Sequence, residues 1–153
     1  MKVANRVEDR LSQELFEELL QERFVQLSTV DFKTGGPNVS ALSWVHAKDE
    51  FTILFAVDNR SRIIQNIARQ PIVALNIIAN ETSYSIGGRA SVQGEASSLI
   101  PINLTIIKLE IEEVRDIMFY GAKIVSEPKF NKTYDEEAAK KLDEQVLTEL
   151  KKH

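Results

Sequence analysis

Two arginines and a serine stand close together at residues 58–62 (DNRSR), between an apolar run that ends at Val57 and a short segment with helical spacing. Ser61 stands where a helix N-cap is expected, and the first turn of a helix offers free backbone N–H groups at the positive end of its dipole. The guanidinium groups of Arg60 and Arg62 suit phosphate oxygens. The spacing fits a site for a phosphate monoester, and it fits equally a solvated turn in which Ser61 only caps the helix.

The single tryptophan, Trp44, favours the first interpretation. An expected strand over residues 38–47 places Trp44 on one face with Ser40, Leu42 and His46, and Val39, Ala41, Ser43 and Val45 on the other. Pairing of this strand with the run that ends at Val57 would bring an aromatic ring and small polar groups near the phosphate anchor. That combination suits an aromatic ligand with a phosphate tail, although a tryptophan in a protein core is also common.

Several other chemistries are excluded or disfavoured by composition. The chain of 153 residues has no cysteine and two histidines, so thiol catalysis and cysteine metal sites are absent, and no metal site is expected. It contains no P-loop, no Gly-x-Gly-x-x-Gly and no Gly-x-Ser-x-Gly motif. A net charge of −4 does not suggest nucleic-acid binding. No signal peptide or apolar run of membrane-spanning length is evident, so a cytoplasmic location is expected.

The elements that must position these residues are mainly strands. Helices are expected at about 8–22, 61–69 and 135–152, the first and last with one apolar stripe. Gly87, Gly88 and Gly94 are expected to mark bulges. Strands are expected at 24–30, 38–47, 51–57, 72–79 and 104–112, and residues 84–99 hold a strand or a strand pair. Residues 114–120 are open between strand and helix. Short strands joined mostly by hairpins predict one antiparallel barrel or sandwich over residues 1–153.

The order of these features resembles the pyridoxamine 5′-phosphate oxidase-like FMN-binding split barrels, in particular the small general stress protein branch. The resemblance spans roughly residues 10–135, and no single motif in it is sharp. It rests on the stretches ELFEELLQERFVQLSTVD, GGPNVSALSWV, FAVDNRSRIIQNIARQPIVAL, GGRASVQGEA and EEVRDIMFYGAKIVSEP.

The resemblance implies a mainly β fold, a six-stranded antiparallel split β-barrel with peripheral helices. It also implies a homodimer with FMN at the subunit interface. The flavin ring would lie along the second strand, the phosphate at Ser61 and Arg62, and Arg89 would reach the flavin. The implied cofactor-binding residues are Ser40, Ala41, Leu42, Ser43, Trp44, Asp58, Ser61, Arg62 and Arg89.

The chain departs from the oxidase pattern at several places. Ile63 stands where the oxidase has a lysine after its Ser-Arg pair, and no arginine-rich substrate segment follows Gly94. A true pyridoxamine phosphate oxidase is therefore not expected. The expected function is a flavin-dependent oxidoreductase acting on an unidentified small molecule. The alternative is a non-catalytic flavin- or heme-binding module for stress or sensing, and an unrelated barrel whose arginines are only surface charge stays open.

Overall fold

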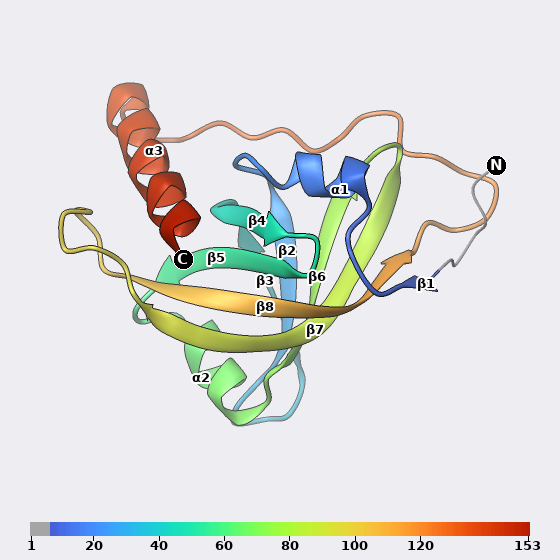
Figure 1. Ribbon diagram of the computed structural model, residues 1–153, viewed down its shortest axis with the longest axis horizontal. Helices are drawn as coiled ribbons and strands as arrows, with labels where there is room; N and C mark the ends of the chain where they lie inside the picture. Colours follow the sequence, from blue (N-terminus) through green and yellow to red (C-terminus); the bar gives the residue numbers. More distant parts are fainter. Residues whose placement is uncertain (1–6) are drawn as a thin grey trace.

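The computed structural model describes residues 7–153, which form one strongly curved antiparallel sheet with three helices (Figure 1). The strands are β1 (Val7–Glu8), β2 (Val25–Val30), β3 (Pro37–Leu42), β4 (Val45–Asp49), β5 (Thr52–Asp58), β6 (Ile72–Ala79), β7 (Thr82–Glu95) and β8 (Leu104–Asp116). The helices are α1 (Gln13–Glu18), α2 (Arg62–Arg69) and α3 (Glu136–Lys152). The predicted fold class, mainly β with an antiparallel split barrel, is confirmed.

The sheet runs in the order β3-β2-β6-β7-β8-β5-β4, with β1 added beside β8. Its two end strands, β3 and β4, follow each other in the chain and are separated only by Ser43 and Trp44. The sheet is therefore not closed by hydrogen bonds between its ends. A bend in the backbone joins them instead.

The main core fills the inside of the curved sheet, and a smaller apolar cluster lies on its outside beneath α3. Strand β5 serves both, which explains its continuous apolar sequence. Ile53, Phe55 and Val57 point into the main core, while Leu54 and Ala56 belong to the cluster under α3.

Most predicted elements are found near their predicted positions. β6 covers 72–79 as predicted, and α2 begins directly after its expected cap. The glycine prediction also holds, because the β7–β8 register shifts at Gly87/Gly88 and at Val92/Gly94. A Cβ at Gly88 would clash with the carbonyl oxygen of Glu110, so this close approach requires glycine.

Two expectations were wrong in extent. The first helix is shorter than 8–22 because Ser12 caps it, its Oγ accepting a hydrogen bond from the Leu15 N–H at 3.2 Å. The Leu19 carbonyl then accepts from Ala47 N–H at 2.8 Å, a bond to β4 rather than one within a longer helix. The predicted strand 38–47 divides into β3 and β4, and with β1 this gives eight strands rather than six.

Candidate functional site

The segment between β5 and α2 directs its two arginines to different partners. The Ser61 Oγ accepts from Ile63 N–H at 3.2 Å and so caps α2. Asp58 Oδ1 accepts from the Arg60 N–H at 2.8 Å and from its Nε at 3.2 Å. These bonds lower the pKa of Asp58 and raise that of Arg60. Arg60 is therefore tied to its own turn, and Arg62 is left for contacts beyond it.

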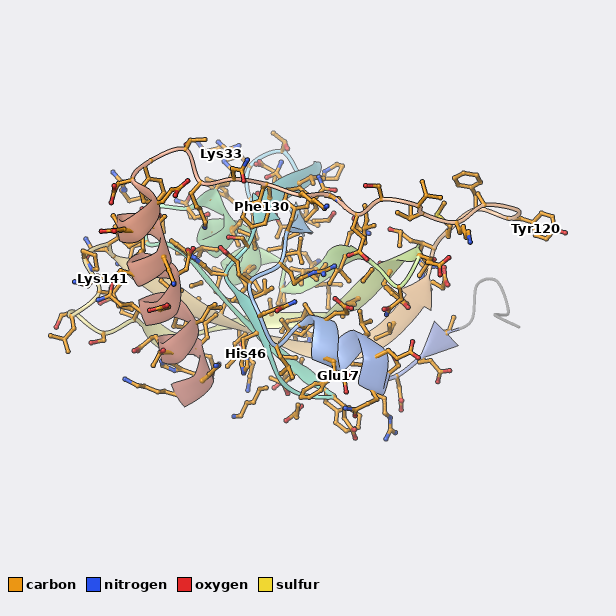
Figure 2. The ribbon with its side chains drawn as sticks, turned by 90° about the horizontal axis from the view of Figure 1, so that it is seen from above. Glu17, Lys33, His46, Tyr120, Phe130 and Lys141 are labelled. Carbon is orange, nitrogen blue, oxygen red and sulfur yellow. The ribbon has the colours of Figure 1, made fainter. Side chains whose placement is uncertain are left out.

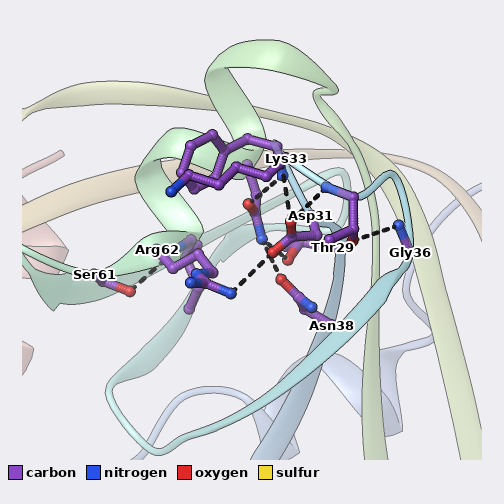
Figure 3. Close-up of polar contacts among 11 residues, drawn as sticks. Thr29, Asp31, Lys33, Gly36, Asn38, Ser61 and Arg62 are labelled. Atoms are coloured by element: carbon purple, nitrogen blue, oxygen red, sulfur yellow. Dashed lines mark hydrogen bonds and ion pairs between the residues drawn. The ribbon is translucent and has the colours of Figure 1, made fainter.

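Arg62 extends toward the turn that links β2 and β3 (Figure 3). Its Nη1 lies 3.0 Å from Oδ1 of Asp31, and its guanidinium lies 5.9 Å from the centre of the Phe32 ring. The Asp31 side chain is 2% exposed, whereas that of Arg62 is 61% exposed. An exposed cation is thus held on a buried carboxylate.

The Asp31 carboxylate is also bound by its own turn. Its Oδ2 accepts from the backbone N–H of Thr34 at 2.8 Å and of Lys33 at 3.0 Å. The Thr34 N–H contributes most to lowering the pKa of Asp31, with smaller contributions from Lys33 and Arg62, while burial opposes the shift. Asp31 is therefore an anion at neutral pH.

Asn66 fixes α2 to this turn. Its side chain is buried, donates to Thr29 Oγ1 at 2.9 Å and to Asn38 Oδ1 at 2.8 Å, and accepts from the Phe32 N–H at 2.9 Å. One side chain thereby links α2 to β2, to β3 and to the turn between them. The position of Arg62 relative to Asp31 is set by this link.

The residues predicted to line the ring site do not share one face. Ser40 is paired with Leu27, which is buried in the main core, so Ser40 lies on the inner side of β3, whereas Ala41 lies on the outer side. In β4, Val45 pairs with Phe55 inside, and His46 pairs with Leu54 outside. The expectation that Ser40, Leu42, Trp44 and His46 line one face is therefore wrong, because the bend at residues 43–44 reverses the alternation.

Ser43 and Trp44 make hydrogen bonds within the chain. Ser43 Oγ donates to Glu22 Oε2 at 2.6 Å, and Trp44 Nε1 donates to Asp143 Oδ1 on α3 at 2.8 Å. Lys132 joins the two carboxylates, with its Nζ 2.8 Å from Glu22 and 3.0 Å from Asp143. Although partial burial opposes it, these hydrogen bonds raise the pKa of Lys132. The bend between β3 and β4 is thus tied to the C-terminal part of the chain.

Arg89 lies apart from both groups. It is exposed on β7, paired with Ile72 of β6 and Glu110 of β8. Two strands, β6 and β2, separate β7 from β3, which corresponds to about 14 Å across the sheet. One copy of the chain therefore does not bring Arg89 to Ser40–Trp44.

His46 is a further titratable group, close to the bend between β3 and β4. His46 has a lowered pKa, caused first by burial and then by Lys151, and its Nδ1 is buried without a hydrogen-bond partner in the described structure. Within residues 7–153, no group of three or more acidic or histidine side chains is arranged to hold a metal ion. No helix in this range is long and apolar enough to cross a membrane.

Residues 11–118 match the sequence profile described as pyridoxamine 5′-phosphate oxidase, which is well over half of the chain. The chain belongs to this family. The profile ends shortly after β8, so the segment from residue 119 through α3 lies outside the matched region. No curated protein matches the sequence.

Solved structures with the family fold have low sequence identity to this chain. HupZ of Group A Streptococcus has a TM-score of 0.59 and 17% identity, with 74% of this chain and 98% of that chain covered. A protein of Lactobacillus delbrueckii, provisionally described as a pyridoxamine 5′-phosphate oxidase, has a TM-score of 0.59 and 23% identity, covering 73% and 98%. General Stress Protein 26 of Bacillus anthracis has a TM-score of 0.54 and 19% identity, covering 68% and 92%. At these identities the likeness shows the fold alone.

Several residues that shape the site were missed in the sequence. The sequence pattern places Asp31 only in a turn and Asn66 only in a helix. Glu22, Lys132 and Asp143 come from three segments far apart in the chain, and no local spacing connects them. An aspartate opening a glycine-containing turn was the one available signal, and it did not indicate contact with Arg62.

Proposed function

We propose that this protein is an FMN-binding flavoprotein, and that it works as a flavin-dependent oxidoreductase on a small molecule still to be identified. The observation that carries the proposal is the position of Arg62 at the start of α2. Its side chain is exposed, next to the Ser61 hydroxyl, and is fixed on one side by Asp31. Membership of the pyridoxamine 5′-phosphate oxidase family supports the same cofactor class.

The residues at the start of α2 fit a phosphate group. Arg62 uses Nη1 for Asp31, which leaves its Nε and Nη2 for phosphate oxygens. The Ser61 Oγ accepts from the helix and keeps its own proton for donation. Ile63 adds no cation, because its side chain is buried in the main core. In the proposal, Ser61 and Arg62 hold the phosphate, and Asp58 shapes the segment by binding Arg60.

The ring would lie along β3, at the edge of the sheet. Strand β3 pairs with β2 alone among the described strands, so backbone groups on its other side face outward and can meet the polar edge of a flavin. Ser40, Ala41 and Leu42 are the proposed ring contacts. Ser43 and Trp44 would join them only after their side chains leave Glu22 and Asp143.

A second copy of the chain would bring Arg89 to the ring. The outer side of β2, β3 and β6 supports such a homodimer, because the side chains on it are uncharged. They belong to Gln26, Ser28, Val30, Val39, Ala41, Ile72, Ala74, Asn76 and Ile78. Val39 is 63% exposed there. Tyr120, at the tip of the segment after β8, projects away from the rest of the chain and is 95% exposed (Figure 2). Large uncharged or apolar surfaces of this kind are typical of interaction sites.

The redox chemistry would come from FMN, which transfers hydride or single electrons when bound. The chain would bind and orient the cofactor, and no side chain has to act as acid or base. With Ile63 in place of the oxidase lysine, oxidation of pyridoxamine phosphate itself is not part of the proposal.

A titration with FMN beside riboflavin, followed by flavin fluorescence, tests the phosphate site. We expect FMN to bind more tightly, and Arg62→Ala to weaken FMN binding by about 1.5–3 kcal/mol while riboflavin binding stays the same. Arg10→Ala is the matched control, because Arg10 also pairs with an aspartate, Asp9 at 2.9 Å, but at the opposite end of β5. Equal affinities of the wild-type protein for FMN and riboflavin would reject the phosphate assignment.

The second candidate function is a non-catalytic flavin- or heme-binding module. HutZ, described as the heme storage protein of Vibrio cholerae, has this fold (TM-score 0.50) and favours this candidate. An F420 reductase also has this fold (TM-score 0.52), which fits the oxidoreductase instead. NAD(P)H oxidation with added FMN separates the two functions. A rate above that of free flavin supports the oxidoreductase, and a rate equal to free flavin, with binding retained, supports the module.

A further inference from the structure

Asp31 makes more hydrogen bonds than a turn residue needs. Two backbone N–H groups, of Lys33 and Thr34, would close the turn by themselves. Its other oxygen is nonetheless directed at Arg62, at 3.0 Å, and the carboxylate has almost no contact with solvent. The turn therefore presents a fixed anion to the arginine of the proposed phosphate site.

Apart from Asp31, few contacts hold the side chain of Arg62 in place. Its side chain is mostly exposed, and its other recorded contact is the face of Phe32 at 5.9 Å. An arginine in this setting would sample many rotamers without Asp31. We propose that Asp31 is a positioning residue, which holds Arg62 so that its remaining N–H groups meet the flavin phosphate; this rests on the proposed function.

Two effects of Asp31 on phosphate binding have opposite signs. Its negative charge repels a phosphate. It also fixes the side chain of Arg62, and the rotamer entropy of an arginine corresponds to a change in affinity of up to about 30-fold. The repulsion is reduced because three donors share the carboxylate, and two of them belong to the backbone and remain in any ligand state. We expect positioning to be the larger effect, and the direction of the change in FMN affinity when the charge is removed distinguishes the two.

The substitution Asp31→Asn tests this directly. Asparagine supports the same kind of turn through its carbonyl oxygen, but the oxygen or amide that it turns toward Arg62 carries no charge. We expect the Kd for FMN to rise about 10-fold, within the limit set by arginine rotamer freedom, and the Kd for riboflavin to stay unchanged. An unchanged or lower Kd for FMN would overturn the proposal, because repulsion alone predicts tighter binding.

Controls separate positioning from damage to the fold. Asp31→Asn placed in the Arg62→Ala background should cause no further loss of FMN affinity, whereas a structural defect would weaken both flavins. Asp9→Asn removes the charge of an exposed aspartate that pairs with an arginine elsewhere, and it should leave both Kd values unchanged. If Asp31→Asn does not fold, Asp31→Ser is used, since serine also supports such a turn but is too short to pair with Arg62.

Failure of the role inferred for Asp31 can be distinguished from failure of the proposed function. If the wild-type protein binds FMN no better than riboflavin, the phosphate site is absent and the inference falls with it. If the wild-type protein prefers FMN and Asp31→Asn keeps that preference, the site stands and the role of Asp31 is rejected.

Discussion

Arg60 and Arg62 are two positions apart in the chain, yet their surroundings differ in how firmly they hold the guanidinium group in place. Arg60 is 91% exposed in its side chain and bound to Asp58 of the same turn. Such a local, solvent-exposed pair contributes little to stability and does not fix a direction in space. Arg62 is held by a buried carboxylate from a turn that is about thirty residues away in sequence. The two arginines differ because Asp58 is an exposed residue of the same turn, whereas Asp31 is buried and belongs to another turn.

Asp31 makes one contribution to the pH dependence of stability. Because its pKa is lowered in the folded protein, its contribution is present above the unfolded pKa of about 3.9 and is lost as pH falls through the folded value. We expect urea denaturation to show the largest difference in unfolding free energy between wild type and Asp31→Asn near pH 7. The difference should shrink below about pH 4. A difference that is constant from pH 7 to pH 3 would contradict the assignment.

The start of α2 shows what could be predicted at single residues. Ser61 as cap and the helix after it follow from local rules, and the structure agrees with both. The partner of Arg62 could not be predicted, because a contact between the turn at Asp31 and α2 depends on how β2, β3 and the helix pack together. Asn66, which controls that packing, has no distinguishing neighbour in sequence.

At the scale of elements, the segment that follows β8 and ends in α3 is attached to the bend between β3 and β4. Lys132 and Asp143 provide this attachment through Glu22 and Trp44, and α3 covers Leu54 and Ala56 of β5 with Val146 and Leu150. This segment lies beyond the family match. It supplies Val146 and Leu150 to the smaller apolar cluster, whose other buried residues lie within the matched range.

Lys132→Met tests the attachment. The substitution leaves the carboxylates of Glu22 and Asp143, both less than one fifth exposed, without their shared cation. We expect a loss of about 1–3 kcal/mol in unfolding free energy and a change in the emission of Trp44, the single tryptophan. Lys141→Met, at an exposed position on α3 (Figure 2), should change neither. Unaltered Trp44 emission in Lys132→Met would argue against the network.

Elements with strong local sequence patterns were predicted well. Elements whose ends are set by contacts with distant residues were not. The apolar run of β6 and the glycines of β7 carry their signals within a few residues. The division of residues 38–47 into β3 and β4 has no such signal. Its cause is a set of bonds from Ser43 and Trp44 to Glu22, in the loop between α1 and β2, and to Asp143 of α3.

At the scale of the whole molecule, the two sides of the sheet's exterior differ. α3 covers the outer side of β4 and β5, whereas the outer side of β2, β3 and β6 carries uncharged side chains. In a chain that is 27% charged, such an area is unusual and fits contact with a second copy.

Val39→Asp tests this contact, because it puts a charge on the edge strand β3 of that area, at a side chain that is 63% exposed. We expect the apparent mass in size-exclusion chromatography with light scattering to fall from dimer to monomer, since burying an unpaired carboxylate is strongly unfavourable. Leu99→Asp is the matched control, at an 87% exposed leucine between β7 and β8. It should leave the mass unchanged. A wild-type protein that is monomeric at micromolar concentration would contradict the homodimer proposal.

The place of β8 between β7 and β5 has a consequence for biosynthesis. β8 is the last strand in the chain, and it joins the group β3-β2-β6-β7 to the hairpin of β4 and β5. On the ribosome, β5 emerges roughly fifty residues before its partner, a delay of roughly 2.5 to 10 s at ordinary rates of translation. During that interval the apolar strand β5 has one unpaired edge. The nascent chain is therefore most exposed to aggregation and to chaperones shortly before its sheet can be completed.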